Sequence, residues 1–174
     1  MTLPEMKTGK TPPILTIKSV EVMADVRSAA WLEQELQPQL ERHRRHQMAD
    51  ICERDNVEGV WRILGVAVAE VRLALLRLLT PQEDTWLSND LERPGSWTFG
   101  FRFALAPDVM EFLKQKIHEY LVAAVMADRT AVIIPSASAV WQTRAVTALA
   151  DLRGTAATAR PPYAPVRRPL WPML

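Results

Sequence analysis

Residues 57–79, VEGVWRILGVAVAEVRLALLRLL, decide what kind of fold this chain can adopt. Their apolar side chains recur at helical spacing and cover most of the circumference of the helix they predict. Asp55 and Glu58 have the spacing of a capping box at its start, and Pro81 stops it. A helix that is apolar nearly all round has to be covered nearly all round, by other helices of the chain or by a neighbouring subunit.

Two further helices are predicted before this one, after a short extended segment at residues 14–17. The first of them begins near Ser19. Pro38 interrupts it, because a proline lacks the backbone donor and its ring clashes with the preceding turn. A new helix over residues 38–52 can start at that proline.

After the long apolar helix, residues 97–105, WTFGFRFAL, alternate between two faces and predict a strand. One face of this strand carries Trp97, Phe99, Phe101, Phe103 and Leu105. An aromatic row of this kind can stack nucleic-acid bases when basic residues share its face, but Arg102 lies on the opposite face. The row is therefore expected to face the core.

Two more helices and one more strand are predicted beyond residue 105. Pro107 suits the first position of a helix, and the residues after it have helical spacing. The β-branched run TAVIIP, residues 130–135, is expected to be the strand that pairs with 97–105. The last helix runs from about Ser136 to Arg153 and ends at Gly154, a residue favoured just after helices.

The length and composition predict one domain, because 174 residues with 48% hydrophobic and 24% charged residues can bury a single sizeable core. We expect a mainly α fold, a small helical bundle with a short two-stranded β element, over residues 14–154. Proline-rich ends predict an extended N-terminal arm over residues 1–13 and a Pro/Arg-rich C-terminal arm over residues 155–174.

The charge and cysteine content exclude several general functions. A net charge of +1 gives no overall attraction to nucleic acid or to an anionic membrane, so such a partner has to meet a local basic patch. The single cysteine, Cys52, excludes an internal disulfide and is expected to be a semi-buried thiol. The N-terminal residues lack the apolar core of a signal peptide, and charged residues interrupt the apolar stretch, which predicts no membrane span and synthesis in the cytoplasm.

Neither a metal site nor an enzyme is predicted. His43 and His46 share a helix face, but Cys52 lies off that face, and a closed zinc site needs four ligands. The sequence has no Gly-rich phosphate loop, no nucleophile elbow and no H-E-x-x-H motif, so neither a catalytic residue nor a cofactor is assigned. His118, beside Glu119 on an amphipathic helix, is expected to be a surface or rim histidine.

The C-terminal stretch ARPPYAPVRRPLWPML, residues 159–174, is the predicted interaction segment. Its five prolines favour the extended polyproline II conformation, which loses little entropy on docking. Bulky residues distinguish it from a solvating tail. The residues assigned to binding are Arg160, Pro162, Tyr163, Arg167, Arg168, Leu170 and Trp171. We expect its arginines to meet acidic residues of the 80–93 loop on an adjacent copy or a portal surface, namely Glu83, Asp84, Asp90 or Glu92.

This chain resembles small prophage proteins of Bacteroides-type bacteria in the order of its predicted elements and in the stretches ILTIKSVEV, SWTFGFRFAL and ADLR. Those prophage proteins are similar in layout to the head–tail connector (neck adaptor) proteins of tailed phages. The resemblance implies a virion structural protein, made in the bacterial cytoplasm, that forms a homo-oligomeric ring. It implies portal or tail proteins of the same particle as partners. It also implies an extended arm that clasps a neighbour.

Two other functions fit the same tail. A nucleic-acid-binding protein would combine the tail with the basic residues Arg42, Arg44 and Arg45. An adaptor for an SH3-type domain would use PYAPVR, which matches the P-x-x-P-x-R form through Pro162, Pro165 and Arg167.

Overall fold

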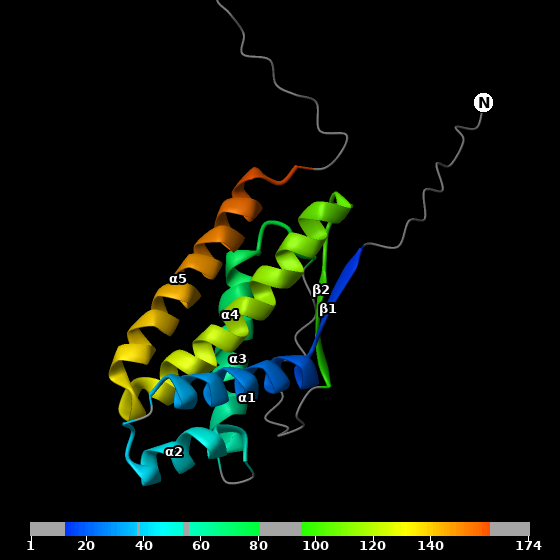
Figure 1. Cartoon of the computed structure of the whole chain (residues 1–174). Coiled ribbons are helices and arrows are strands. Elements are labelled where there is room, and N and C mark those ends of the chain that lie inside the picture. The colour runs from blue at the N-terminus through cyan, green and yellow to red at the C-terminus, as the bar shows by residue number, and fades with distance from the viewer. Residues whose placement is uncertain (1–12, 38, 54–55, 81–94, 161–174) are drawn as a thin grey trace, which may run out of the picture.

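The computed structural model describes residues 13–37, 39–53, 56–80 and 95–160. Within these residues the chain is mainly helical and has one two-stranded antiparallel sheet, as predicted (Figure 1). The elements in chain order are β1 (Ile14–Lys18), α1 (Ser19–Leu36), α2 (Arg42–Ala49), the 3-10 helix η1 (Asp50–Cys52), α3 (Val57–Ala74), β2 (Ser96–Gly100), α4 (Pro107–Ile133) and α5 (Pro135–Thr158).

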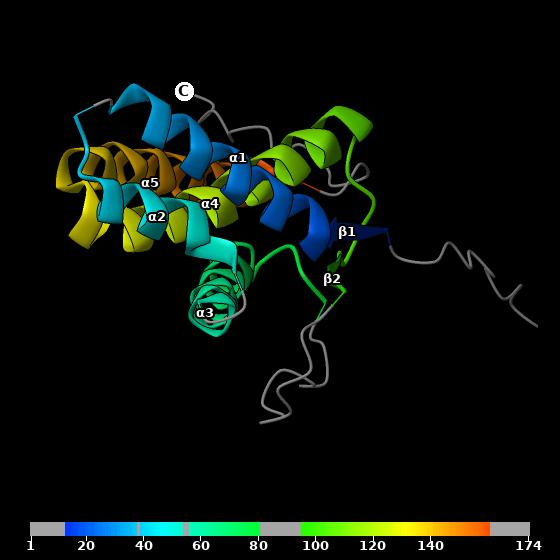
Figure 2. The same ribbon diagram turned by 60° about the horizontal axis from the view of Figure 1, so that its bottom comes forward.

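Helix α4 is the centre of the bundle and contacts α1, α3 and α5. Figure 2 shows α1 and α3 on opposite sides of it, with α5 alongside. Its buried residues point in several directions around the helix axis because three helices cover it. They are Leu113, Ile117, Tyr120, Leu121, Val122, Ala123, Val125, Met126, Ala127 and Thr130. Every other helix is therefore positioned by what it covers on α4.

Helices α4 and α5 form a close antiparallel hairpin. Most of the residues that α5 buries are small, which lets the two backbones approach. The buried Ser138 hydroxyl donates a hydrogen bond of 2.7 Å to the carbonyl oxygen of Ala127 on α4. At the start of α5, the Trp141 Nε1 donates to the Glu33 carboxylate of α1 at 2.8 Å, so α1 is fixed to both helices of the hairpin.

The sheet closes the end of the bundle where α1 begins. β1 pairs with β2 in a register that places Leu15 opposite Phe99 and Ile17 opposite Trp97, and all four side chains are buried. Phe101 is also fully buried just after β2 ends, and its backbone N–H donates to Pro13 at 2.9 Å. The prediction that this aromatic row belongs to the core is thereby confirmed for its buried members, whereas Phe103 and Leu105 pack against the core only in part.

The predicted strand at residues 130–135 is wrong. Thr130 to Ile133 form the last turn of α4, and the strand that pairs with β2 is β1. The Thr130 side chain is buried and donates to the Met126 carbonyl oxygen at 2.6 Å, a bond that fits the helical backbone. Propensity for strands depends on context, and the packing of α4 determines the conformation of this β-branched run.

Several predicted helix ends also differ from the structure. α5 continues through Gly154 to Thr158, because Ala156 in its last turn packs against the core and an exposed glycine costs a helix only about 1 kcal/mol. α3 ends at Ala74, and the chain then turns so that Leu79 can pair with Phe101.

The helix expected over residues 38–52 begins at Arg42 and becomes a 3-10 helix at Asp50. The preceding helix begins at Ser19, as predicted, and ends at Leu36. Asp55, the expected cap of α3, lies outside the described residues. Of the two predicted arms, the structure describes only Pro13 and residues 155–160, and residues 155–158 belong to α5.

Replacing Phe101 with alanine is expected to lower the free energy of unfolding by about 3–5 kcal/mol, because the side chain is fully buried and leaves a cavity. Phe112→Ala is the matched control. The Phe112 side chain is 39% exposed on α4, so its loss is expected to cost about 1 kcal/mol or less. Urea unfolding followed by circular dichroism measures both, and equal losses would contradict the assignment of Phe101 to the core.

Candidate functional site

The outer side of α3 carries large apolar side chains that no described residue covers. Val66, Leu73 and Leu76 are 63%, 68% and 60% exposed. Val60 and Val71 lie on the other side of the same helix and are fully buried. The described residues therefore cover this apolar helix on one side only. We call Val66 and Leu73 of α3, together with Leu76 in the turn that follows the helix, the α3 face.

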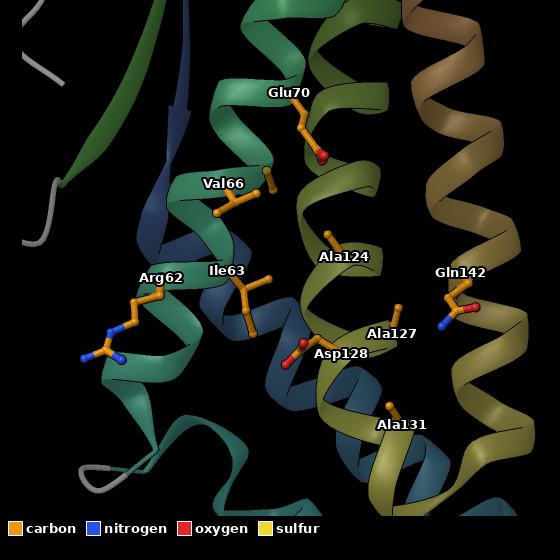
Figure 3. Close-up of a pocket in the computed structure, with 10 residues that line it drawn as sticks. Arg62, Ile63, Val66, Glu70, Ala124, Ala127, Asp128, Ala131 and Gln142 are labelled. Carbon is orange, nitrogen blue, oxygen red and sulfur yellow. The ribbon is translucent and has the colours of Figure 1, made fainter. Parts of the chain in front are cut away.

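An open groove of about 540 Å³ runs beside the α3 face, between α3 and the α4–α5 hairpin (Figure 3). Ile63 and Val66 form its wall on α3, and small side chains of α4 form its floor. The floor residues are Ala124, Ala127 and Ala131, at helical spacing. Polar groups of Asp128 and Gln142 lie along the hairpin side. Val66 belongs to both the groove and the α3 face, so the two form one continuous surface.

One hydrogen bond fixes this surface relative to the core. The hydroxyl of Tyr120 on α4 donates to the carboxylate of Glu70 on α3. Burial raises the pKa of Tyr120, and the hydrogen bond and negative charge of Glu70 raise it further. Glu70 also lines the groove, where Figure 3 shows its carboxylate directed toward α4. The bond to Tyr120 holds Glu70 on the side of α3 that faces α4. It therefore fixes how α3 is rotated about its own axis, with Val66 and Leu73 exposed.

A second apolar surface lies at the end of α1. Trp31, Leu32 and Leu36 are 59%, 54% and 73% exposed, and we call them the α1 face. Trp31 and Leu32 border a shallow depression with Arg27 and Ser28. These residues were not predicted from the sequence. Their spacing separates Trp31 and Leu32 from the residues that α1 buries, but spacing does not show which of the two groups faces the core.

Most of the interaction residues assigned from sequence lie outside the described residues. Arg160 is described, and it is exposed just after α5. The others are Pro162, Tyr163, Arg167, Arg168, Leu170 and Trp171 of the tail and Glu83, Asp84, Asp90 and Glu92 of the acidic loop. The pairing of the basic tail with the acidic loop therefore remains a prediction.

The histidines occupy polar surroundings. His43 and His46 are exposed on α2, and His43 Nδ1 lies 3.3 Å from the Glu41 carboxylate. His118 is partly exposed, and its Nε2 lies 2.6 Å from the Asp25 carboxylate of α1, which agrees with a rim position. Among the described residues, no group of three His, Cys, Asp or Glu side chains is arranged to hold a metal ion.

The single cysteine lies inside the fold, whereas two arginines of α2 lie on its surface. Cys52 is buried, and burial raises the pKa of its thiol, although the nearby Arg27 opposes this shift. Arg42 and Arg44 are exposed on α2, as expected for a solvated basic face. No helix in the described part of the chain combines the length and apolar character needed to cross a membrane.

Comparison with known proteins gives no relative for this chain. No family model, no curated protein sequence and no solved structure matches it. The α3 face and the α1 face are two apolar surfaces of the described residues, and function is inferred below from the chain's own surfaces.

Alkaline titration tests the Tyr120–Glu70 contact. The pKa of Tyr120 is raised in the folded protein. The contact therefore contributes its full stabilisation of the fold at pH values below the ordinary tyrosine pKa of about 10, and this contribution is lost as the pH rises above that value. A Tyr163→Phe variant leaves Tyr120 as the one tyrosine, so ultraviolet absorbance reports it alone. We expect ionisation well above pH 10, together with loss of helical signal. Ionisation in the ordinary range with the fold intact would contradict the contact.

Proposed function

We propose that this protein is a structural assembly protein that acts through protein–protein contacts and takes no part in catalysis. In its more specific form the proposal is a head–tail connector, or neck adaptor, that forms a ring in a phage or prophage particle. It would be made in the bacterial cytoplasm, and its partners would be further copies of itself and the portal or tail proteins of that particle. The observation that carries the proposal is the exposed α3 face.

The α3 face has the properties of a contact surface. Val66 and Leu73 lie two helical turns apart on α3, Leu76 follows in the turn after the helix, and Val66 also lines the groove. Soluble monomers rarely expose such contiguous patches, which generally mark interaction sites. Apolar side chains contribute about 25 cal/mol for each Å² removed from water, so covering these three would contribute a few kcal/mol. That gain only matches the lowest estimates of the entropic cost of association, so a stable assembly would need additional contacts.

The C-terminal tail is the proposed source of an additional contact. Its bulky residues Leu170 and Trp171 suit an apolar pocket, and Arg167 and Arg168 suit an acidic surface. The tail begins where α5 ends, at Thr158, and the buried Ala156 belongs to that helix. A truncation that tests the tail should therefore begin at residue 161, so that the last turn of α5 keeps its packing.

Light scattering tests whether the α3 face mediates assembly. We expect the wild-type protein to be an oligomer and the double variant Val66→Gln/Leu73→Gln to have a lower mass, because polar side chains would have to be buried in the contact. Val132→Gln/Val146→Gln is the matched control, since these valines are 87% and 69% exposed elsewhere on the surface. A monomeric wild-type protein, or an α3 variant of unchanged mass, would count against this surface.

Removing residues 161–174 tests the tail in the same assay. We expect the truncated protein to keep its helical circular dichroism and its thermal midpoint, because no described core residue is removed. Its oligomeric mass is expected to fall, since the arm would no longer reach a neighbour. An oligomer of unchanged subunit number would show that the tail is not an assembly arm.

A further inference from the structure

We propose that the C-terminal tail of one copy, residues 161–174, binds in the groove between α3 and the α4–α5 hairpin of a neighbouring copy. This inference rests on the proposed function, because it identifies the pocket that receives the tail. Leu170 and Trp171 would lie on the alanine floor of that groove. Three features support the assignment: the lining of the groove, the length of the tail, and the place where the tail leaves the bundle.

The groove has the size and lining of a site for bulky apolar side chains. Its volume is about 540 Å³, and pockets that hold small ligands have volumes of about 300–1,000 Å³. Ile63 and Val66 form the wall on α3, and the alanines of the floor leave room above α4 that a larger side chain can fill. Val66 also belongs to the α3 face, so a segment bound in the groove covers part of that face as well.

The floor has the length of three extended residues. Ala124 and Ala131 are seven residues apart on α4, which corresponds to about 10 Å along the helix axis. Three residues in the polyproline II conformation extend about 9 Å. The tail contains such a triplet in Leu170, Trp171 and Pro172. Tryptophan is among the residues that contribute most to binding when a pocket encloses it.

The tail is long enough to reach a second copy. Leu170 is ten residues beyond Arg160, the last residue that the structure describes. Ten residues in polyproline II span about 31 Å. This span approaches the length of α5, whose 24 residues extend about 36 Å. An arm of this length can cross the boundary between two adjacent subunits.

The tail leaves the bundle at a distance from its own groove. Gln142, which lines the groove, lies in the half of α5 nearer the turn from α4, whereas the tail follows Thr158 at the other end (Figure 1). These two residues are about 24 Å apart along the helix axis. To fill its own groove, the tail would have to reverse direction at Pro161 and Pro162. Each proline favours an extended conformation for itself and for the residue before it, so a neighbouring copy is the expected tail donor.

The charges beside the groove are mixed. Arg62 lines it together with Glu70 and Asp128. Glu70 accepts the hydrogen bond from Tyr120, and the Asp128 carboxylate lies 4.0 Å from the Nε of Arg129. Net charge therefore neither attracts nor excludes the basic tail, and the apolar contacts of Leu170 and Trp171 determine the fit.

Cross-linking between two full-length variants tests this arrangement. One variant carries Ala131→Cys at an exposed position of the groove floor, and the other carries Met173→Cys, which keeps Leu170 and Trp171. In an equal mixture, a short bismaleimide cross-linker is expected to join one chain of each kind, doubling the mass from 19.7 kDa. Intact mass spectrometry separates mixed pairs from like pairs, because the two variants differ in mass.

Two controls accompany the cross-linking. The wild-type protein measures the reaction of the buried Cys52. Val20→Cys replaces Ala131→Cys at a position that is 67% exposed on α1, outside the groove. The mixed product with Met173→Cys is expected to be lost in this control, and equal yields at both positions would contradict the groove as the binding site.

Filling the groove tests the same contact without a cross-linker. Ala131→Trp places a large side chain on the floor, and Trp171→Ala removes the side chain proposed to bind there. Each is expected to lower the oligomeric mass measured by light scattering, and the double variant to lower it no further, because both changes remove one contact. Val20→Trp adds the same ring outside the groove and should leave the mass unchanged. Circular dichroism checks that each variant retains its helical content.

The outcomes separate this inference from the proposed function. If no mixed product forms while removal of residues 161–174 still lowers the mass, the tail contacts a neighbour elsewhere, and its assignment to the groove is overturned. A cross-link within a chain that carries both cysteines, without any mixed product, would show that the tail fills its own groove and would overturn the exchange between copies. A monomeric wild-type protein without mixed product overturns both this inference and the proposed assembly.

Discussion

The cover of α4 is the constraint on which the rest of this structure depends. A helix of 27 residues that buries side chains in several directions cannot be stable in water unless other elements enclose it. α1, α3 and α5 supply that enclosure, and each is held by a specific polar contact as well as by apolar packing. Tyr120 binds Glu70 of α3, His118 lies against Asp25 of α1, and Ser138 of α5 donates to Ala127. These bonds set how each surrounding helix is rotated about its own axis.

The rotation of the surrounding helices explains why two apolar faces are left exposed. α3 has more apolar residues than one packed side requires, so fixing Glu70 beside Tyr120 directs Val66 and Leu73 outward. In the same way, α1 buries Val22 and Val26 in the core, while the residues of the α1 face near its end stay exposed. Neither exposed set contributes to the packing of α4, so stability of the fold does not explain its apolar character. Association with another surface, as proposed above, would explain it.

Local patterns predicted the fold better than the pairing of its parts. Strict alternation identified the aromatic strand, and helical spacing identified the helix after Pro107. The partner of the strand could not be found in this way, because residues 14–18 and 130–134 are both short apolar runs with β-branched residues. The two runs are distinguished only in the folded structure, where Thr130 is buried in α4 and residue 130 is helical. Likewise, Gly154 signals a helix end, but the burial of Ala156 continues the helix beyond it.

Of the two exposed apolar faces, the sequence pointed to the one on α3 and missed the one on α1. The excess of apolar residues in 57–79 indicated that α3 would need cover from other helices of the chain or from a neighbouring subunit, and the structure leaves Val66 and Leu73 mostly exposed among the described residues. The α1 face escaped notice because the exposure of Trp31 depends on which side of α1 meets α4, and spacing alone does not fix that side. The assigned tail and loop residues, apart from Arg160, lie outside the described part of the chain.

A small contact of this kind favours closed assemblies over single pairs. Covering the α3 face contributes only a few kcal/mol, which is comparable to the lowest estimates of the entropic cost of joining two molecules. In a ring the last subunit makes two contacts but loses its translational freedom once, so closure adds a contact at high effective concentration. Weak contacts can thus hold together a ring of the kind proposed above.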